Sequence, residues 1–258
     1  MKIISLGLGV QSTAMYLMSS LGYIERADYA IFADPGAELP DTYKLWDYLN
    51  DWAKYNNGIP LIKKKKSLYK DIIKGQNSSG NKWASIPAFG ESGGMIRRQC
   101  TKEYKIDVVV KEIRKLHGLK KNKHMKPTIL YLGISIDEIQ RMKESRLFNI
   151  TYKYPLIDNQ ISRIDCIKFL EERSFNNVKK SSCVFCPYHS NKNWKEIKQN
   201  YPKEWKKVLK VDKAIRNASK RGNKDKLYLH RTLKPINEAY LQEDQEELFM
   251  CEEGYCGI

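Results

Sequence analysis

The sequence predicts an α/β fold in which a doubly wound, mostly parallel sheet is followed by a basic helical C-terminal region. Short apolar runs of strand type alternate with stretches whose apolar residues recur at helical spacing. Glycine, hydroxyl and acidic residues follow several of these runs, and such positions form the ligand-binding edge of parallel sheets. We therefore expect an α/β domain at residues 1–160, with a helical, cysteine-bearing basic region at 161–258 packed on it.

The first strand leads into a turn at residues 5–14 that has the composition of an anion-binding loop. Gly7 and Gly9 allow positive φ and a close approach of a ligand to the backbone. Ser12 and Thr13 lie where the first free N–H groups of the following helix point outward. Such a turn is built to hold an anion, most often phosphate, and the alternative is a glycine-containing turn with no ligand.

The second strand, expected at 29–33, ends at a segment that carries Asp34 and Glu38, and a helix opens at 39–43. Because the carboxyl ends of parallel strands share one edge of the sheet, we expect Asp34 on the same edge as the first turn. The alternative interpretation is an ordinary turn aspartate before a proline.

A third strand is expected at 59–62, and a run of four lysines follows it. Such a run is most often a solvated face, but at the end of a strand it would lie on the ligand edge. The segment 75–94 is rich in Gly, Ser and Asn and is expected to form a long mobile loop. Its Trp83 and Phe89 are expected either to stack on nucleic acid bases or to pack locally.

Cys100 is expected at the start of a helix, beside Arg97, Arg98 and Lys102. Neighbouring cations and a helix N-terminus favour the thiolate, which is the form that ligates metals and attacks electrophiles. The alternative is a single buried, inert cysteine.

A further strand at 128–132 ends shortly before Asp137 and Glu138, with Arg141 about one helical turn beyond. These side chains are expected either to contact phosphate and its Mg²⁺ or to form an ordinary helix start with acidic residues in its first turn.

Ser162 and Asp165 predict a helix that begins with a capping box. Cys166 lies inside this helix among apolar residues, and we interpret it as a core residue. Two short amphipathic helices are predicted around 194–201 and 205–212, and their polar faces are almost wholly cationic.

Cys183 and Cys186 stand two residues apart, a spacing that lets both sulfurs bind one metal. The remaining ligands must come from elsewhere, and the candidates are Cys100, Cys251, Cys256 and His189. Thiolates alone suit zinc or a [4Fe–4S] cluster, whereas a histidine ligand would favour zinc. Six cysteines in a reducing compartment indicate metal or redox chemistry more than a disulfide framework.

The chain carries 46 Lys and Arg against 30 Asp and Glu, a net charge of +16. Such a field attracts polyanions, so we expect nucleic acid (DNA or tRNA) as a partner and the cationic helical faces as its footprint. The alternatives are a phosphorylated small molecule and a solvated basic surface. No apolar run approaches membrane-spanning length and Met1 leads directly into a strand, so a cytoplasmic protein without a membrane partner is expected.

The first turn resembles the pyrophosphate loop, Ser-Gly-Gly-x-Asp-Ser, of the adenine nucleotide α-hydrolase (PP-loop ATP pyrophosphatase) superfamily. Gly9 and Ser12 match this pattern, while Leu8 and Gln11 stand where it has Gly and Asp. The Asp-x-Gly-x-Glu segment that begins at Asp34, followed by Pro-Asp-Thr, is similar to the phosphoadenylylsulfate (PAPS) reductase family within that superfamily.

Later segments are similar to the same family. The Arg-x-Cys-x-x-x-x-Lys pattern around Cys100 and the acidic segment around Asp137 resemble PAPS reductase relatives, which include the sulfur-inserting enzymes of DNA phosphorothioation. The C-terminal Tyr-Cys-Gly-Ile around Cys256 is similar to the Glu-Cys-Gly-Leu/Ile-His tail of PAPS reductases, whose cysteine attacks the substrate sulfur. Because relatives carry a [4Fe–4S] cluster near the nucleotide, the resemblance favours that cluster over Zn²⁺.

The resemblance implies that the α/β domain binds ATP, or PAPS, with Mg²⁺. The backbone near Phe32 and Ala33 would receive the adenine. The other implied nucleotide-binding residues are Gly7, Gly9, Gln11, Ser12, Thr13, Asp34 and Glu38. The implied metal ligands are Cys100, Cys183, Cys186, Cys251 and Cys256. The implied catalytic residues are Ser12, Asp137, Arg141 and Cys256.

The implied reaction is adenylation-coupled sulfur transfer to a nucleic acid. An acceptor oxygen would attack the α-phosphorus of ATP and expel pyrophosphate, and sulfur delivered at the cluster would then displace AMP. A sulfur donor such as a cysteine desulfurase is the implied protein partner. Two alternatives stay open: a PAPS or adenylylsulfate reductase with Cys256 as nucleophile, and an inactive subunit that binds nucleotide or nucleic acid, which Gln11 in place of Asp favours.

Overall fold

The computed structural model describes residues 1–80, 86–120, 123–217 and 225–242, which form two compact units. Unit 1 consists of Met1–Ala33, Pro40–Lys64 and Asp107–Ser181, and unit 2 of Asp34–Leu39, Lys65–Ile106 and Ser182–Ile258. Each unit is thus assembled from segments far apart in the sequence. The division expected at residue 160 does not coincide with these boundaries, because 161–181 lies in unit 1 and 65–106 lies in unit 2.

Unit 1 is built on a five-stranded sheet with the strand order β3-β2-β1-β5-β6. Its strands are β1 (Lys2–Ser5), β2 (Tyr29–Asp34), β3 (Leu61–Lys65), β5 (Thr128–Leu132) and β6 (Ile150–Lys153). Strand β1 pairs in parallel with both β2 and β5, and β5 pairs in parallel with β6. The chain therefore winds in opposite directions from β1 and from β5, so a topological switch point lies between these two strands.

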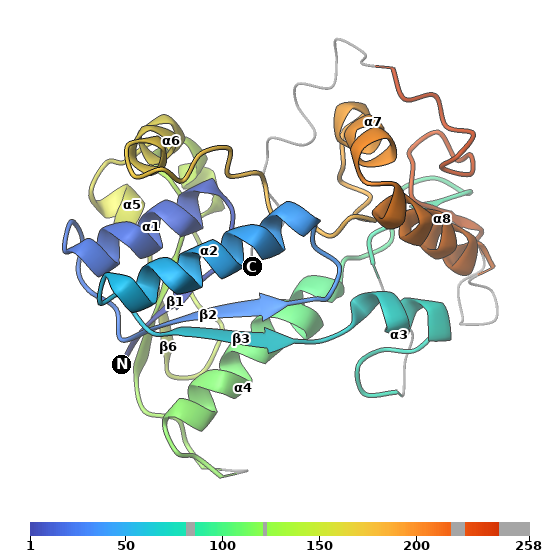
Figure 1. Cartoon of the computed structure of the whole chain (residues 1–258). Coiled ribbons are helices and arrows are strands. Elements are labelled where there is room, and N and C mark those ends of the chain that lie inside the picture. Colours follow the sequence, from blue (N-terminus) through green and yellow to red (C-terminus); the bar gives the residue numbers. More distant parts are fainter. Residues whose placement is uncertain (81–85, 121–122, 218–224, 243–258) are drawn as a thin grey trace. The chain divides into compact units, whose positions relative to one another are not determined.

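Helices flank this sheet on both faces, as the sequence predicts for an α/β fold. They are α1 (Val10–Leu21), α2 (Pro40–Tyr55), α4 (Asp107–Leu116), α5 (Pro155–Asp158) and α6 (Arg163–Glu171), with a 3₁₀ helix η2 (Ile136–Arg141). In Figure 1, α1 and α2 lie on one side of the sheet and α4 lies on the other. The predicted capping box is confirmed at α6, where Ser162 Oγ accepts the Asp165 N–H at 3.1 Å and the Asp165 carboxylate accepts the Ser162 N–H at 2.9 Å.

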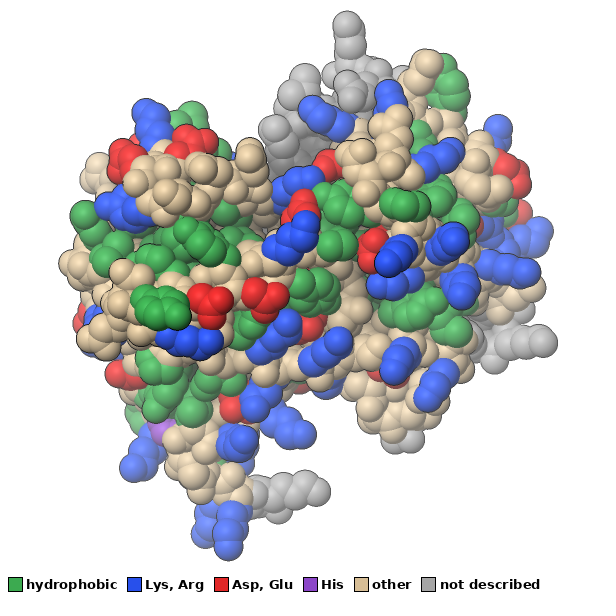
Figure 2. Space-filling model, in the orientation of Figure 1, with side chains coloured by type: hydrophobic (Ala, Val, Ile, Leu, Met, Phe, Trp, Pro, Cys, Tyr) green, Lys and Arg blue, Asp and Glu red, His purple; other side chains and the backbone are tan. Residues whose placement is uncertain are grey.

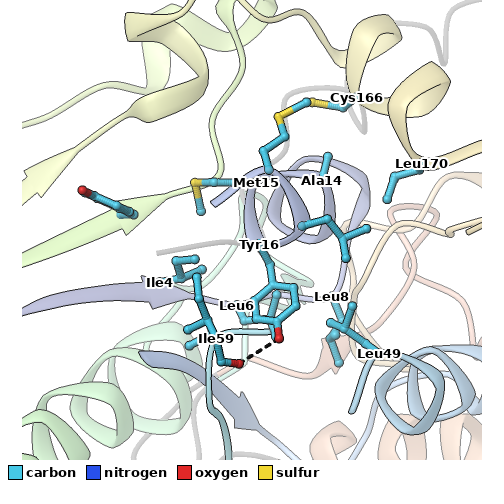
Figure 3. Packing of buried hydrophobic residues seen from close by; sticks show 14 of the residues in the cluster. Ile4, Leu6, Leu8, Ala14, Met15, Tyr16, Leu49, Ile59, Cys166 and Leu170 are labelled. Atoms are coloured by element: carbon cyan, nitrogen blue, oxygen red, sulfur yellow. Dashed lines mark hydrogen bonds between the residues drawn. The ribbon is translucent and has the colours of Figure 1, made fainter. Parts of the chain in front are cut away.

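The core of unit 1 lies between the sheet and helices α1, α2 and α6, and Figure 3 shows part of it. Ile4 and Leu6 meet the apolar side of α1 there, and Tyr16 donates its hydroxyl proton to the Ile59 carbonyl at 2.8 Å. Cys166 is fully buried, and burial raises the pKa of its thiol to about 12. Its interpretation as a core residue is confirmed.

The third strand differs from the expectation, because β3 spans Leu61–Lys65 rather than 59–62. Its lysines are therefore part of an edge strand instead of following it. Lys63 lies with its ammonium 4.8 Å from the ring centroid of Tyr43 and 5.4 Å from that of Trp46. The apolar stem of a lysine covers such rings while its charge stays near water, and lysines on an edge strand also oppose pairing with another chain.

Unit 2 is mainly helical and has its own hydrophobic cluster. Its elements are α3 (Leu68–Lys74), β4 (Phe89–Gly90), a π-helix η1 (Lys102–Ile106), α7 (Asn191–Asn200), α8 (Pro202–Arg216) and β7 (Leu227–Tyr228). The two predicted amphipathic helices are confirmed as α7 and α8, whose Trp194, Ile197 and Val208 are buried. Phe89 is half-buried in β4, paired with Tyr228 of β7, so it packs locally, whereas Trp83 lies outside the described residues.

Buried polar side chains fasten the segment 225–242 to the helices of unit 2. Asp212 on α8 accepts the backbone N–H groups of Leu229 at 3.1 Å and of Ile236 at 3.2 Å, and Arg216 at 2.5 Å. His230 is buried with Nε2 2.7 Å from Asn191 Oδ1, which can only accept, so Nε2 carries the proton. Among the residues that the structure describes, no helix is long and apolar enough to cross a membrane.

Candidate functional site

The hydroxyl of Ser12 makes three hydrogen bonds within the turn after β1. Ser12 Oγ accepts the backbone N–H groups of Gly7 and Gly9, each at 3.2 Å, and donates to the Gly9 carbonyl at 3.3 Å. Helix α1 then starts at Val10, with Gly9 as its N-cap. Ser12 therefore shapes the loop in which its own helix begins, and the first N–H groups of α1 have no partner within the helix.

The positive φ in this turn falls on Leu8, which corrects the expectation for Gly7 and Gly9. Leu8 has φ of 59°, whereas Gly9 has φ of −96° and Gly7 also lies outside the left-handed region. A left-handed conformation costs a leucine about 1–2 kcal/mol. The Leu8 side chain is only 1% exposed, and burying a leucine contributes about 2 kcal/mol, which offsets that cost.

Contrary to the expectation for this position, the backbone N–H of Thr13 is not free. Its side chain is fully buried, and its Oγ1 has no hydrogen-bond partner among the described residues. Its backbone N–H donates to the Gly9 carbonyl at 3.0 Å, so it is already part of the helical hydrogen-bond ladder. Only Ser12 of the two hydroxyl residues shapes the loop.

The segment after β5 packs directly on this turn. Ser5 and Leu132 are paired in register, so the loops that follow β1 and β5 emerge side by side at the switch point. A Cβ on Gly133 would lie 2.8 Å from the Ser12 Cα and 2.9 Å from the Ser12 nitrogen. Only glycine allows this close approach of the two backbones.

A polar network links this turn to η2 and α6. Gln11 is 9% exposed, and its Oε1 accepts a hydrogen bond from Arg163 Nη1 at 2.9 Å. Its Nε2 donates to Glu138 Oε2 at 3.2 Å, and the same carboxylate oxygen lies 2.6 Å from Arg141 Nη1. Asp137 accepts the hydroxyl of Ser135 at 3.0 Å and the backbone N–H of Arg163.

The structure thus brings together the predicted residues Gln11, Ser12, Asp137 and Arg141, and adds Arg163. Sequence reasoning missed Arg163, although the capping box at Ser162 correctly predicted that α6 begins beside it. Nothing local indicates that its side chain reaches Gln11, which is 152 positions away.

The segment after β2 holds its acidic side chains inside unit 2. Asp34 and Glu38 are both buried; Asp34 Oδ1 accepts the Gly36 N–H at 2.7 Å, and Glu38 Oε1 lies 3.7 Å from Lys105 Nζ. Gly36 has φ of 72°, and a Cβ there would meet the Lys66 carbonyl oxygen at 2.6 Å. Asp34 therefore organises the turn that follows it, whereas Glu38 is paired with Lys105. Phe32 and Ala33 of β2, in unit 1, are also buried.

The cysteine pair forms one turn of unit 2. The Cys186 N–H donates to the Cys183 carbonyl at 2.9 Å, and His189 Nε2 lies 2.9 Å from the same oxygen. A carbonyl only accepts, so that nitrogen of His189 carries a proton and is not a metal ligand. Cys100 and Cys183 are half-buried and pack against the same hydrophobic cluster.

Three metal-ligating side chains do not converge anywhere in the described parts of the chain. Cys251 and Cys256 lie outside those parts. Three predicted ligands, Cys100, Cys183 and Cys186, thus belong to unit 2, and the structure does not gather them into a metal centre.

Exposed lysines recur along α7 and α8 at helical spacing. They are Lys192, Lys195 and Lys198 on α7, and Lys203, Lys206, Lys210 and Lys213 on α8. The acidic residues of α8 are engaged elsewhere, since Asp212 is buried and Glu204 lies 3.5 Å from Lys207. Figure 2 shows Lys and Arg side chains gathered over the region of α8. We call this set of seven lysines the lysine surface.

The predicted site residues divide between the two units. The turn after β1, Asp137 and Arg141 belong to unit 1, whereas Asp34, Glu38 and the described cysteines of the predicted metal site belong to unit 2. Comparison of the chain with protein-family models, with curated proteins and with solved structures gives no match.

Proposed function

We propose that this protein is a PAPS reductase-like enzyme of the adenine nucleotide α-hydrolase superfamily that performs adenylation-coupled sulfur transfer to a nucleic acid. The observation that carries the proposal is the turn between β1 and α1 at the switch point of the sheet. Ligands of open α/β sheets bind beyond the carboxyl ends of the strands at that point. The turn is folded by Ser12, the hydroxyl that matches the family pattern, and ends at the N-terminus of a twelve-residue helix.

The conformation of Leu8 further supports the resemblance. Leu8 stands where the superfamily pattern has glycine, and it adopts the left-handed conformation that glycine adopts at no cost. The backbone of this chain at position 8 therefore has a conformation that suits the glycine of the superfamily pattern, although the residue here is leucine.

The chemistry would begin with the triphosphate of ATP held by the first N–H groups of α1. An oxygen of the nucleic acid attacks the α-phosphorus, the bond to pyrophosphate breaks, and the acceptor becomes adenylylated. A thiol reductant releases hydrosulfide from the persulfide of a donor such as a cysteine desulfurase, and this hydrosulfide attacks the adenylylated acceptor atom. The bond from that atom to oxygen breaks, AMP leaves with the oxygen, and the acceptor keeps the sulfur as a thiol. The helix N-terminus and Arg141 would stabilise the charge that develops on the phosphates.

The cysteines of unit 2 are proposed to hold a [4Fe–4S] cluster, with Zn²⁺ as the alternative. Thiolates are a donor type that suits both groups. Cys100, Cys183 and Cys186 would be ligands, with Cys251 or Cys256 as the fourth. When bound, such a cluster supplies sulfide and one-electron chemistry beside the cysteines.

The lysine surface supports nucleic acid as the acceptor. Seven exposed lysines at helical spacing, with the acids of α8 engaged elsewhere, form the sequence-independent contact that a phosphate backbone requires. Binding through such contacts weakens steeply as salt rises. Replacing Lys206 and Lys210 by Gln is expected to reduce the slope of log affinity against log salt by about 2, because each phosphate contact contributes about 0.9.

The test is release of pyrophosphate and AMP from ATP by anaerobically purified, cluster-loaded protein with DNA or tRNA. Ser12→Ala is expected to lower this release about tenfold or more, because the loop loses its central hydrogen bonds. Ser79→Ala, at an exposed serine of unit 2, is the matched control and is expected to leave it unchanged.

Other outcomes of this test would change the proposal. Release of neither product with any nucleic acid would contradict it. Turnover of PAPS to sulfite, lost in Cys256→Ser, would instead establish the reductase, and ATP binding without turnover would establish a binding subunit.

A further inference from the structure

Position 11 is occupied by the one kind of side chain that its neighbours permit. An amide accepts through its oxygen and donates through its nitrogen. Gln11 does both, since its Oε1 accepts from Arg163 and its Nε2 donates to Glu138. A carboxylate at this position would keep the hydrogen bond from Arg163 but would face Glu138 with like charge. Gln11 is therefore a neutral bridge between a cation and an anion.

The carboxylates beside the turn are already engaged by protein donors. Glu138 is held by Gln11 and by Arg141 at 2.6 Å, and Asp137 by the Ser135 hydroxyl and the Arg163 backbone. The two arginine charges balance the two carboxylate charges. These bonds all end on Glu138 Oε2 and Asp137 Oδ2, so a Mg²⁺ ion would approach the other oxygen of each carboxylate. It would join a cluster that already holds two guanidinium cations, one of them paired with Glu138, and like charge disfavours that. The charges present therefore do not favour a protein-ligated Mg²⁺.

The guanidinium of Arg163 has N–H donors beyond the one that it gives to Gln11. It lies exposed at the first residue of α6, and within the described residues its guanidinium donates only to Gln11. A guanidinium has five N–H donors in a planar fork that matches phosphate oxygens. Its backbone is fixed on Asp137 and its side chain on Gln11, so the fork is held beside the residue that precedes Ser12.

We propose that Arg163, positioned by Gln11, supplies the positive charge at the phosphate end of the site in place of a divalent cation held by protein carboxylates. The inference rests on the proposed nucleotide binding at the turn after β1. It explains why an amide occupies position 11, where the superfamily pattern has Asp, without loss of binding. The protein accordingly binds ATP whether or not Mg²⁺ is present.

The experiment is calorimetric titration of the full-length protein with ATP and with adenosine, each in Mg²⁺ and in EDTA. The Kd of the wild type for ATP is expected to change less than about threefold between the two conditions, since no protein ligand to the metal is lost. Arg163→Met is expected to weaken ATP binding about 10- to 100-fold in both, because charge-assisted hydrogen bonds are lost, and to leave adenosine binding unchanged. Lys168→Met, at an exposed lysine of the same helix, is the matched control and is expected to bind ATP like the wild type.

A second variant tests the role of Gln11. Gln11→Asp is expected to bind ATP at least about tenfold more weakly in EDTA than in Mg²⁺, because it restores a carboxylate but repels Glu138. Circular dichroism of each variant verifies that it is folded, and Arg163→Lys, which keeps the charge without the fork, is expected to bind with intermediate affinity.

Three results would overturn the inference. They are wild-type ATP binding that EDTA abolishes, Arg163→Met binding that equals the wild type, and Gln11→Asp binding that EDTA leaves unchanged. In each of these cases ATP still binds in Mg²⁺, so the proposed nucleotide site survives. A wild type that binds ATP in neither condition overturns the proposed function as well.

Discussion

Each of the two units has its own hydrophobic core, but different groups satisfy the backbone hydrogen bonds within each unit. Unit 1 packs aliphatic side chains such as Ile4 and Leu17 against a five-stranded sheet, whose strands satisfy their own backbone groups. In unit 2 the described strands are only two residues long, and buried polar side chains, Asp212 and His230, satisfy the backbone and side-chain groups of the segment 225–242. Truncating a buried apolar side chain costs a free energy that grows with the volume lost. A buried hydrogen-bonding group that loses its partner costs the desolvation of that group instead.

This difference teaches where each unit is vulnerable. Unit 1 is expected to respond to changes of volume and backbone conformation, and unit 2 to the loss or protonation of single polar groups. Amide hydrogen exchange resolves the two responses, because it reports the opening of each unit separately.

The largest effect is expected from Asp212→Ala in unit 2. It leaves the N–H groups of Leu229 and Ile236 buried without an acceptor and removes the partner of Arg216, so unit 2 should lose about 3 kcal/mol or more. Exchange at the amides of Leu229 and Ile236 should accelerate while the amides of β1 and β5 stay protected. Equal acceleration in both units would show that they unfold together and would remove the comparison.

The next effect is a loss of stability of unit 2 in acid. Burial, with a smaller contribution from the Arg231 charge, lowers the pKa of His230 to about 4. The imidazole is neutral in the folded state, whereas in the unfolded chain it binds a proton below about pH 6.5. Because the unfolded state then holds more protons, stability falls as the pH drops from about 6.5 to about 4, by about 3 kcal/mol in total.

Urea denaturation across this pH range measures that loss. His230→Gln, which cannot be protonated, should flatten the dependence, and His124→Gln, at an exposed histidine of unit 1, should preserve it. A wild-type stability that stays constant between pH 6.5 and pH 4 would contradict the expectation.

A smaller and more specific effect is expected at Leu8 in unit 1. Leu8→Ala should cost about 2–3 kcal/mol, because it opens a cavity while the left-handed backbone keeps its strain. Leu8→Gly removes the Leu8 side chain completely, but glycine adopts the left-handed conformation without strain, which relieves about 1 kcal/mol. The Leu8→Gly variant should therefore be no less stable than Leu8→Ala. Leu170→Ala and Leu170→Gly inside α6 are the matched pair, and there glycine should be worse by about 1 kcal/mol. If the Gly variant were less stable than the Ala variant at both Leu8 and Leu170, the Leu8 backbone would not be strained.

The smallest effect is a difference in the reactivity of the cysteines of the two units, and measuring it requires no variant. Cys166 is fully buried in unit 1 with its pKa raised to about 12, whereas Cys183 and Cys186 of unit 2 are half-buried. Because the thiolate is the reactive form, iodoacetamide should label the pair in metal-free native protein and reach Cys166 only after denaturation. Labelling of Cys166 at the rate of Cys186 in the native protein would contradict its place in the core.

Much of unit 1 could be predicted from the sequence because its signals are local. The apolar runs predict β2 and β5 to within a residue, and the capping box predicts the first residue of α6. The error at β3 arose because lysines were assumed to end a strand, whereas an edge strand accommodates them. The α/β class needed only these local patterns.

Much less of the candidate site could be predicted. Ser12 was predicted from the first turn and Arg141 from the segment after the strand at 128–132, each with its resemblance to a known pattern, but Arg163 was not predicted. Glycine content also misled the prediction of φ in the first turn, since the left-handed residue is Leu8, whose strain is offset by packing that no local pattern reveals.

The sequence by itself determined the turn chemistry, the helix starts, the cysteine spacing and the positive charge, because these depend on residues within a few positions of one another. The tertiary structure decided which residues meet: β5 beside β1, Gly133 against Ser12, and Arg163 on Gln11. It also decided that each unit is assembled from segments that are far apart in the sequence. The physical reason is that hydrogen bonding and steric preference act locally along the chain, whereas the order of strands is chosen by the burial of the whole sheet.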